Sequence, residues 1–235
     1  MHRTPRSVVA LGMLTAQLFS SHAAAQPPAQ DRLVEMQAIA SALGVSCDYC
    51  HKNMRGRAAD GETPVPEPEK AVALAMMAMT RDLNARVQSA TGKPAGEATT
   101  VRCVTCHRGV PIPRPLDEIV FQAVLRDGAP AAAAQYRDLR QRYFGRGTYD
   151  FGEEALLGVA RRFAQSRPPD AITLLEMNLE FHPESADGYA ALGYAYTRLG
   201  DDGSALTYLE KALELQPENG TVRGQVEQLR RFQRR

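Results

Sequence analysis

The chain of 235 residues contains no tryptophan, only four cysteines and five histidines, and no tract of basic residues. Its formal net charge is +1, and aromatic residues make up only 6% of it. Near-neutral charge without a basic tract argues against nucleic acid as a partner. A hydrophobic content of 44% and a charged content of 23% are ordinary for a globular chain of one or two domains.

A long hydrophobic run is also missing, since a bilayer crossing needs about 20 apolar residues. The apolar stretch near the start, "SVVALGMLTAQLF", follows the basic "MHRTPR" and precedes the small residues of "SSHAAAQ". This order predicts a secretory signal peptide over residues 1–25, with an uncleaved anchor helix as the alternative. No cysteine follows the run that could carry a lipid anchor. We therefore expect an exported, periplasmic protein with no transmembrane segment after cleavage.

The four cysteines form two copies of one pattern, "CDYCH" at 47–51 and "CVTCH" at 103–107. C-x-x-C-H is the attachment signature of c-type haem, because two thiols at this spacing can bond the two vinyl groups of a porphyrin. The next residue, histidine, then lies under the iron. The sequence therefore predicts two covalent haem c groups, bound through Cys47, Cys50, Cys103 and Cys106, with His51 and His107 as axial ligands of iron.

Paired cysteines also occur in structural zinc sites and in disulfides. Four cysteines in two C-x-x-C pairs can hold a structural zinc ion, and an exported chain can oxidise each pair to a disulfide. Neither explanation gives a role to the histidine that follows both pairs. We therefore favour haem.

Scarce histidine limits the second axial ligand of each iron. His2 and His22 leave with the predicted signal peptide, and beyond the two motifs only His182 remains, in a distant segment that we expect at the surface. Two haems with two histidines each are therefore excluded within one chain. Methionine is the expected alternative, and its thioether raises the reduction potential.

Met36 lies in "DRLVEMQAIASALG", whose apolar residues fall on one face of a predicted helix that Gly44 ends. The helix from Met36 to Gly44 is about 12 Å long, close to the width of a porphyrin. Such a helix can lie along one haem face while the chain turns and brings His51 to the other. We predict Met36 as the distal ligand of the first haem, with ordinary core packing as the alternative.

A second helix is predicted over "EKAVALAMMAMTRDLNARVQSA", residues 69–90. Met76 and Met79 share its apolar stripe, whereas Met77 points roughly 100° away from Met76. Met79 is nearer the end of its helix, as Met36 is in the first. The stripe alone leaves Met76 and Met79 as candidates for the second haem.

The segments "MQAIASALGVSCDYCH", "MAMTRDLN" and "VTCHRGVPIPRP" resemble the tetrahaem cytochrome subunit of photosynthetic reaction centres, over about residues 33–115. The resemblance implies haem units that each consist of a helix with the methionine ligand, a turn and C-x-x-C-H. The family pattern M-x-R-x-I/L-N falls on Met79, Arg81, Leu83 and Asn84, which favours Met79 as the ligand. This chain has two haem motifs rather than four, lacks the lipid-anchor cysteine of some members, and has an unrelated C-terminal half. A photosynthetic role therefore does not follow.

The C-terminal half contains a repeat. "AITLLEMNLEFHPES" at 171–185 aligns with "ALTYLEKALELQPEN" at 205–219, at an offset of 34 residues. The period and its Leu-Gly-x-x-Tyr, Ala and Pro positions resemble the tetratricopeptide repeat, a helical hairpin. Looser matches before 171 and a last helix near 221–235 complete a small solenoid. We expect an all-α fold with a signal peptide (1–25), a dihaem cytochrome domain (26–115) and a helical-repeat domain (116–235).

These features predict a periplasmic dihaem c-type cytochrome that carries single electrons and is not an enzyme. Redox partner proteins could dock on the helical-repeat face. The alternative is a tetratricopeptide adaptor in which the haems are a redox sensor or a structural element. A peroxidase-like enzyme is a weaker rival, because it would need an open iron position.

Overall fold

The computed structural model describes residues 29–51 and 68–234. Over these residues the secondary structure is helical and contains no strand, which confirms the all-α prediction. The predicted signal peptide lies outside the described residues, and so do residues 52–67. Within the described ranges, no helix combines the length and the hydrophobicity that crossing a membrane requires.

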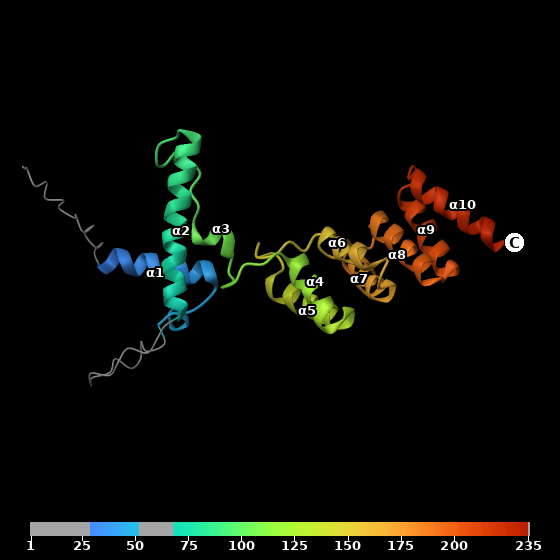
Figure 1. The fold of residues 1–235 in the computed structure, drawn as a ribbon, viewed down its shortest axis with the longest axis horizontal. Helices are drawn as coiled ribbons and strands as arrows, with labels where there is room; N and C mark the ends of the chain where they lie inside the picture. Colours follow the sequence, from blue (N-terminus) through green and yellow to red (C-terminus); the bar gives the residue numbers. More distant parts are fainter. Residues whose placement is uncertain (1–28, 52–67, 235) are drawn as a thin grey trace, which may run out of the picture.

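Three helices and one 3-10 turn precede Leu116, and seven helices follow it in the described residues (Figure 1). The first group comprises α1 (Ala29–Leu43), η1 (Cys47–Tyr49), α2 (Pro68–Thr91) and α3 (Cys103–His107). The second group comprises α4 (Leu116–Asp127), α5 (Ala129–Tyr143), α6 (Glu154–Phe163), α7 (Pro168–Phe181), α8 (Ala186–Leu199), α9 (Asp202–Leu215) and α10 (Gly220–Gln233).

The two helices expected before the haem motifs are both present. α1 ends one residue before Gly44, which takes a positive φ of 67° and turns the chain toward the first motif. α2 extends one residue beyond the predicted range at each end. Figure 1 shows α2 as the long upright helix beside α1 and α3, and α1 and α3 pack against each other.

The helices from α4 to α10 form a row of hairpins in which each helix packs on its neighbours (Figure 1). Side chains cap three of their N-termini: Ser185 Oγ accepts from Gly188 N–H at 2.8 Å, and Asp201 and Asn219 cap α9 and α10 in the same way. Ser185 and Asn219 are 34 positions apart. The structural repeat therefore has the period of the sequence repeat.

The hydrophobic core of the described residues lies in the helical-repeat half. It has one cluster over α4 to α8 and a smaller one over α9 and α10. Among the described residues before Leu116, only Ala42, Ala98, His107 and Val110 are buried. The N-terminal half therefore buries very little of its own apolar surface, although its helices carry apolar stripes.

Candidate functional site

The second C-x-x-C-H motif forms the short helix α3, which α2 holds through one side chain. The amide of Asn84, on α2, donates from Nδ2 to Val101 O at 2.9 Å and accepts from Val101 N–H at 2.7 Å on Oδ1. Thr105 Oγ1 then accepts from Arg102 N–H at 3.0 Å at the start of α3. These contacts fix the backbone just before Cys103, the first residue of the motif.

His107, the last residue of α3, is 9% exposed. Its Nδ1 lies 3.0 Å from the carbonyl oxygen of Val110. Because a carbonyl can only accept, Nδ1 carries the proton and Nε2 keeps its lone pair. A histidine oriented in this way by its other nitrogen is the usual arrangement for a metal ligand.

The first motif follows α1 as a tight turn. His51 N–H donates to Cys47 O at 3.0 Å, which closes one turn of chain over the two thiols. The segments that flank the two motifs are also joined, because Gly109 N–H, just after α3, donates to Ala42 O near the end of α1 at 2.8 Å. The haem-motif segments therefore form one connected unit.

A cavity of about 140 Å³ lies between α1, the first motif and α2. Met36, Cys47, Cys50 and His51 all line it, so the structure brings together every residue predicted for the first haem. The rest of its lining is mostly apolar and includes Ile39, Ala40, Leu43, Val45, Ala73, Leu74 and Met77. Thiols, imidazole and thioether around one apolar space are the donor set that a c-type haem requires.

A second cavity, of about 300 Å³, is lined by Cys103 and His107 of the second motif and by residues of α2. The remaining member of the motif, Cys106, is exposed and lines a different cavity. The two haem-side cavities share the lining residues Ile39, Leu43, Cys50, Ala73 and Met77. They are therefore adjacent spaces on one side of α2.

The structure places the α2 methionines differently from the sequence pattern. Met76 and Met77 both line the second cavity, and Met77 lines the first as well. Met79, predicted from the pattern, is 46% exposed and lines neither haem-side cavity. Met79 stays a prediction as the distal ligand of the second haem. Met76 is the alternative ligand, because it lines the same cavity as His107.

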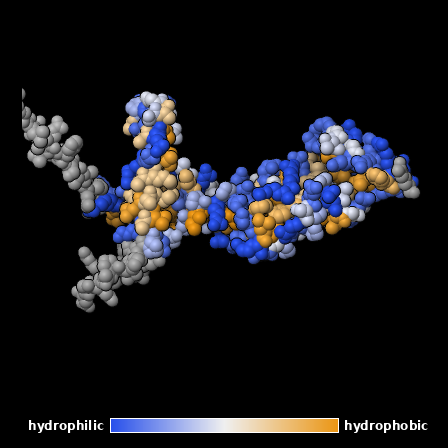
Figure 2. Space-filling model, in the orientation of Figure 1, coloured by the Kyte–Doolittle hydropathy of each residue, from blue (hydrophilic) through white to orange (hydrophobic). Residues whose placement is uncertain are grey.

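The apolar surface of α2 is only partly covered by protein. None of its residues is buried, and Val72 and Leu74 are 62% and 56% exposed. Figure 2 shows hydrophobic side chains along the visible face of α2. The enclosed volumes lie at or below the range of roughly 300–1,000 Å³ for small-molecule sites. Apolar side chains of α2 are therefore available to contact a bound cofactor.

The sequence pattern missed the function of two residues. Asn84 entered only as the last letter of the M-x-R-x-I/L-N pattern, yet its amide positions the second motif. Met77 was set aside from the apolar stripe, yet it lines both cavities. His182, expected at the surface, ends α7 half-buried and lines a separate cavity with Ser185 and Gln216.

Two family models match separate parts of the chain. Residues 66–138 match the photosynthetic reaction centre cytochrome C subunit family, and residues 186–219 match the tetratricopeptide repeat family. The first match includes the second motif and ends inside α5, beyond the predicted domain boundary at 115.

Two characterised proteins are similar to parts of the chain. Cytochrome c-554 of Chloroflexus aurantiacus is 36% identical over 75 residues, which are 32% of this chain and 16% of that protein. The photosynthetic reaction center cytochrome c subunit of Rubrivivax gelatinosus is 33% identical over 107 residues, 42% of this chain and 28% of that protein. This chain thus matches about a sixth and about a quarter of their lengths. The resemblance that the motifs and repeats predicted is confirmed.

Proposed function

We propose that this protein is a periplasmic dihaem c-type cytochrome that carries single electrons between partner proteins. One observation supports it most: Cys47, Cys50 and His51 of the first motif line one apolar cavity, and Cys103 and His107 of the second line an adjacent one, beside a helix with no buried residue. Two haems would supply the core that the N-terminal half otherwise lacks.

Each group of residues has a separate role in this proposal. Cys47 and Cys50 would hold the first haem, and His51 and Met36 would ligate its iron. Cys103 and Cys106 would hold the second haem, and His107 would ligate its iron together with Met79 according to the sequence pattern or Met76 according to the cavity. When bound, each haem supplies the one-electron chemistry of its iron.

The protein itself orients the iron ligands and provides an apolar environment for the haems. The bond from His107 Nδ1 to Val110 O orients the imidazole and strengthens it as a ligand. Apolar lining excludes water, and two thioether ligands would favour the reduced irons over a bis-histidine arrangement. Because the two cavities share lining residues, haems bound in them would be neighbours.

Intact mass of the exported protein, matured in a host that attaches haem, tests the proposal. We expect a mature chain that begins at Gln26 and carries two haems, with haem staining on a denaturing gel. Cys47→Ala combined with Cys50→Ala should leave one haem. A zinc adduct, or one haem on the unchanged protein, contradicts the proposal.

The second candidate function is that of an adaptor, in which the helical-repeat half would bind a partner protein. A cavity of about 390 Å³ lies on this half, lined by residues of α6, α7, α8 and α10 that include Arg161, Asp187 and the 39% exposed Tyr194. A redox partner could dock here in either function. Reduction by a partner that slows when residues 116–235 are removed supports a carrier with a docking domain. Partner binding that persists without any electron transfer supports the adaptor.

An enzyme with an open iron position is distinguished by ligand binding. If both irons have six ligands, carbon monoxide and cyanide should bind slowly or weakly. Rapid binding to one haem, together with peroxide turnover, would favour the enzyme.

A further inference from the structure

We propose that Thr148, in the loop between α5 and α6, positions the backbone that follows the second haem motif. The helical-repeat half would then be part of the second haem's surroundings and not only an appended docking domain. This inference rests on the proposed function in one respect, since it takes His107 as the ligand of the second iron.

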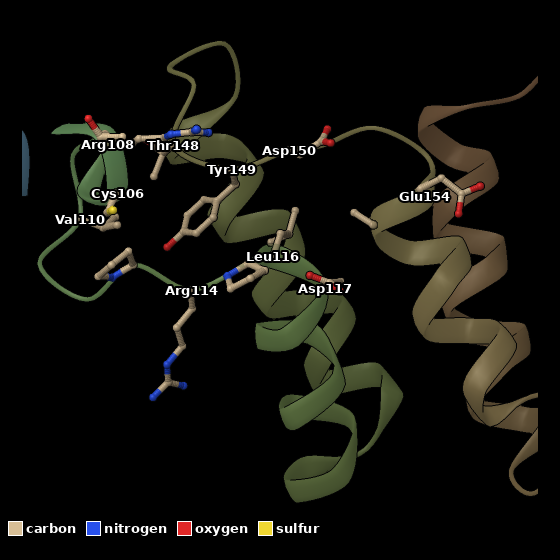
Figure 3. Close-up of a pocket in the computed structure, with 14 residues that line it drawn as sticks. Cys106, Arg108, Val110, Arg114, Leu116, Asp117, Thr148, Tyr149, Asp150 and Glu154 are labelled. Atoms are coloured by element: carbon tan, nitrogen blue, oxygen red, sulfur yellow. The ribbon is translucent and has the colours of Figure 1, made fainter. Parts of the chain in front are cut away.

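The contact joins residues 40 positions apart in the chain. Thr148 Oγ1 donates to the carbonyl oxygen of Arg108 at 2.7 Å, and Figure 3 shows the two residues side by side. Arg108 directly follows His107 and has a φ of 48°, the single positive φ of a non-glycine residue among the described ones. A left-handed backbone is unfavourable for a residue with a Cβ. The bond from Thr148 therefore stabilises a conformation that the local sequence disfavours.

The segment from His107 to Val110 is a tight loop held from several sides. His107 Nδ1 bonds to Val110 O inside the loop, Val110 N–H donates to His107 O at 3.0 Å, and Gly109 N–H bonds to Ala42 O of α1. Thr148 adds a contact from the helical-repeat half. A change in the backbone of Arg108 would displace the carbonyl of Val110, which orients the imidazole.

The position of Thr148 is fixed because the residues next to it pack into the core of the helical-repeat half. The ring of Tyr149 packs edge-on against Tyr143 at 5.3 Å and against Phe151 at 6.1 Å. Phe151 is 6% exposed and packs against Tyr136, which is fully buried. A positioning group acts well only when its own place is fixed by packing, and this loop meets that condition.

A cavity at the same junction shows how near the second motif lies to the repeat half. Its volume is about 490 Å³, and Cys106 and Arg108 line it together with Thr148, Tyr149 and Leu116 (Figure 3). Cys106, one of the two thiols that would bond the second haem, thus borders residues of α4 and of the loop between α5 and α6.

The experiment compares variants of the haem-loaded full chain by hydrogen–deuterium exchange and by redox titration. Thr148→Val removes the hydroxyl and keeps the shape, whereas Thr148→Ser keeps the hydroxyl. Thr173→Val is the matched control, because its hydroxyl bonds only to Pro169 O within α7, at 3.1 Å. Peptides that cover 103–112 and 36–51 report on the two motifs separately.

We expect Thr148→Val to speed exchange of the Gly109 and Val110 amides about five-fold, which RT ln 5 converts to about 1 kcal/mol, as for one hydrogen bond. The midpoint potential of the second haem should shift while that of the first does not. Thr148→Ser should restore both readings, and Thr173→Val should change neither. If the Thr148 hydroxyl only stabilised the fold, its removal would not shift the midpoint potential of the second haem alone.

Unchanged exchange and potential in folded Thr148→Val overturn the inference, and so does a shift that Thr148→Ser fails to reverse. If Thr148→Val unfolds the repeat half, the comparison of Thr148→Ser with Thr148→Ala decides by the same criteria. Intact mass is read separately: absence of the second haem contradicts the proposed function, while amide exchange still tests the contact itself.

Discussion

Gly44 lies so close to Gly109 that a Cβ atom added to it would be 2.2 Å from the carbonyl oxygen of Gly109. The approach accompanies the bond from Gly109 N–H to Ala42 O. At this point the turn before the first haem motif and the loop after the second touch through backbone alone. The spacing of the two proposed haems therefore depends on a residue without a side chain at position 44.

Gly44→Ala tests this contact, with Gly92→Ala as a matched control. Both glycines have a positive φ, 67° and 64°, but a Cβ on Gly92 would meet nothing within 4 Å. The left-handed backbone alone should cost each variant about 1–2 kcal/mol. Gly44→Ala should lose at least about 1 kcal/mol more, because Gly109 must move away. Urea unfolding of the haem-loaded protein measures both, and equal losses would show that the contact is not made.

Asn84→Ala should loosen the second motif, because it leaves both Val101 backbone groups without their partners. The expected loss is about 1–3 kcal/mol, and exchange of the Val101 amide should accelerate. Arg86→Ala on the same helix is the control: its ion pair with Asp82 is 75% and 60% exposed and should contribute under about 1 kcal/mol. If the two variants behave alike, the Asn84 amide does not hold the motif.

The elements that local signals specify could be predicted, and the contacts between distant segments could not. Apolar periodicity and Gly44 placed α1 and α2 within a few residues, and the 34-residue repeat placed the hairpins. The junction was missed because Thr148 and Arg108 are 40 positions apart and form a bond that no pattern encodes. The predicted placement of the α2 methionines differs from the structure for a related reason. The rotation of a helix about its own axis depends on the segments it packs against, and the sequence of the helix alone does not specify it.

The cap of α9 should make the repeat half sensitive to acid. Hydrogen bonds from Ser204 lower the pKa of Asp201 below its ordinary value of 3.8. A lowered pKa in the folded state stabilises the protein above the unfolded-state pKa, and this stabilisation disappears as pH falls through the folded-state value. Asp201→Ala should therefore lower the melting temperature at pH 7 and have less effect as the pH falls through the lowered pKa of Asp201. Asp201→Asn keeps a capping oxygen without a charge, so its advantage over Asp201→Ala should persist in acid; thermal melts at several pH values show whether it does.

The distal ligand of the second haem is decided by methionine-to-leucine variants. Leucine is close to methionine in volume, so lost packing should cost under about 1.5 kcal/mol, and a large spectral change would report lost ligation. Because Met76 lines the cavity of His107 and Met79 is 46% exposed, we expect Met76→Leu to give one high-spin haem with a lowered potential. Met79→Leu should leave the spectrum nearly unchanged, and Met36→Leu should affect only the first haem. A high-spin second haem in Met79→Leu, with Met76→Leu unaffected, would instead establish the ligand that the sequence pattern predicts, one helical turn further along α2.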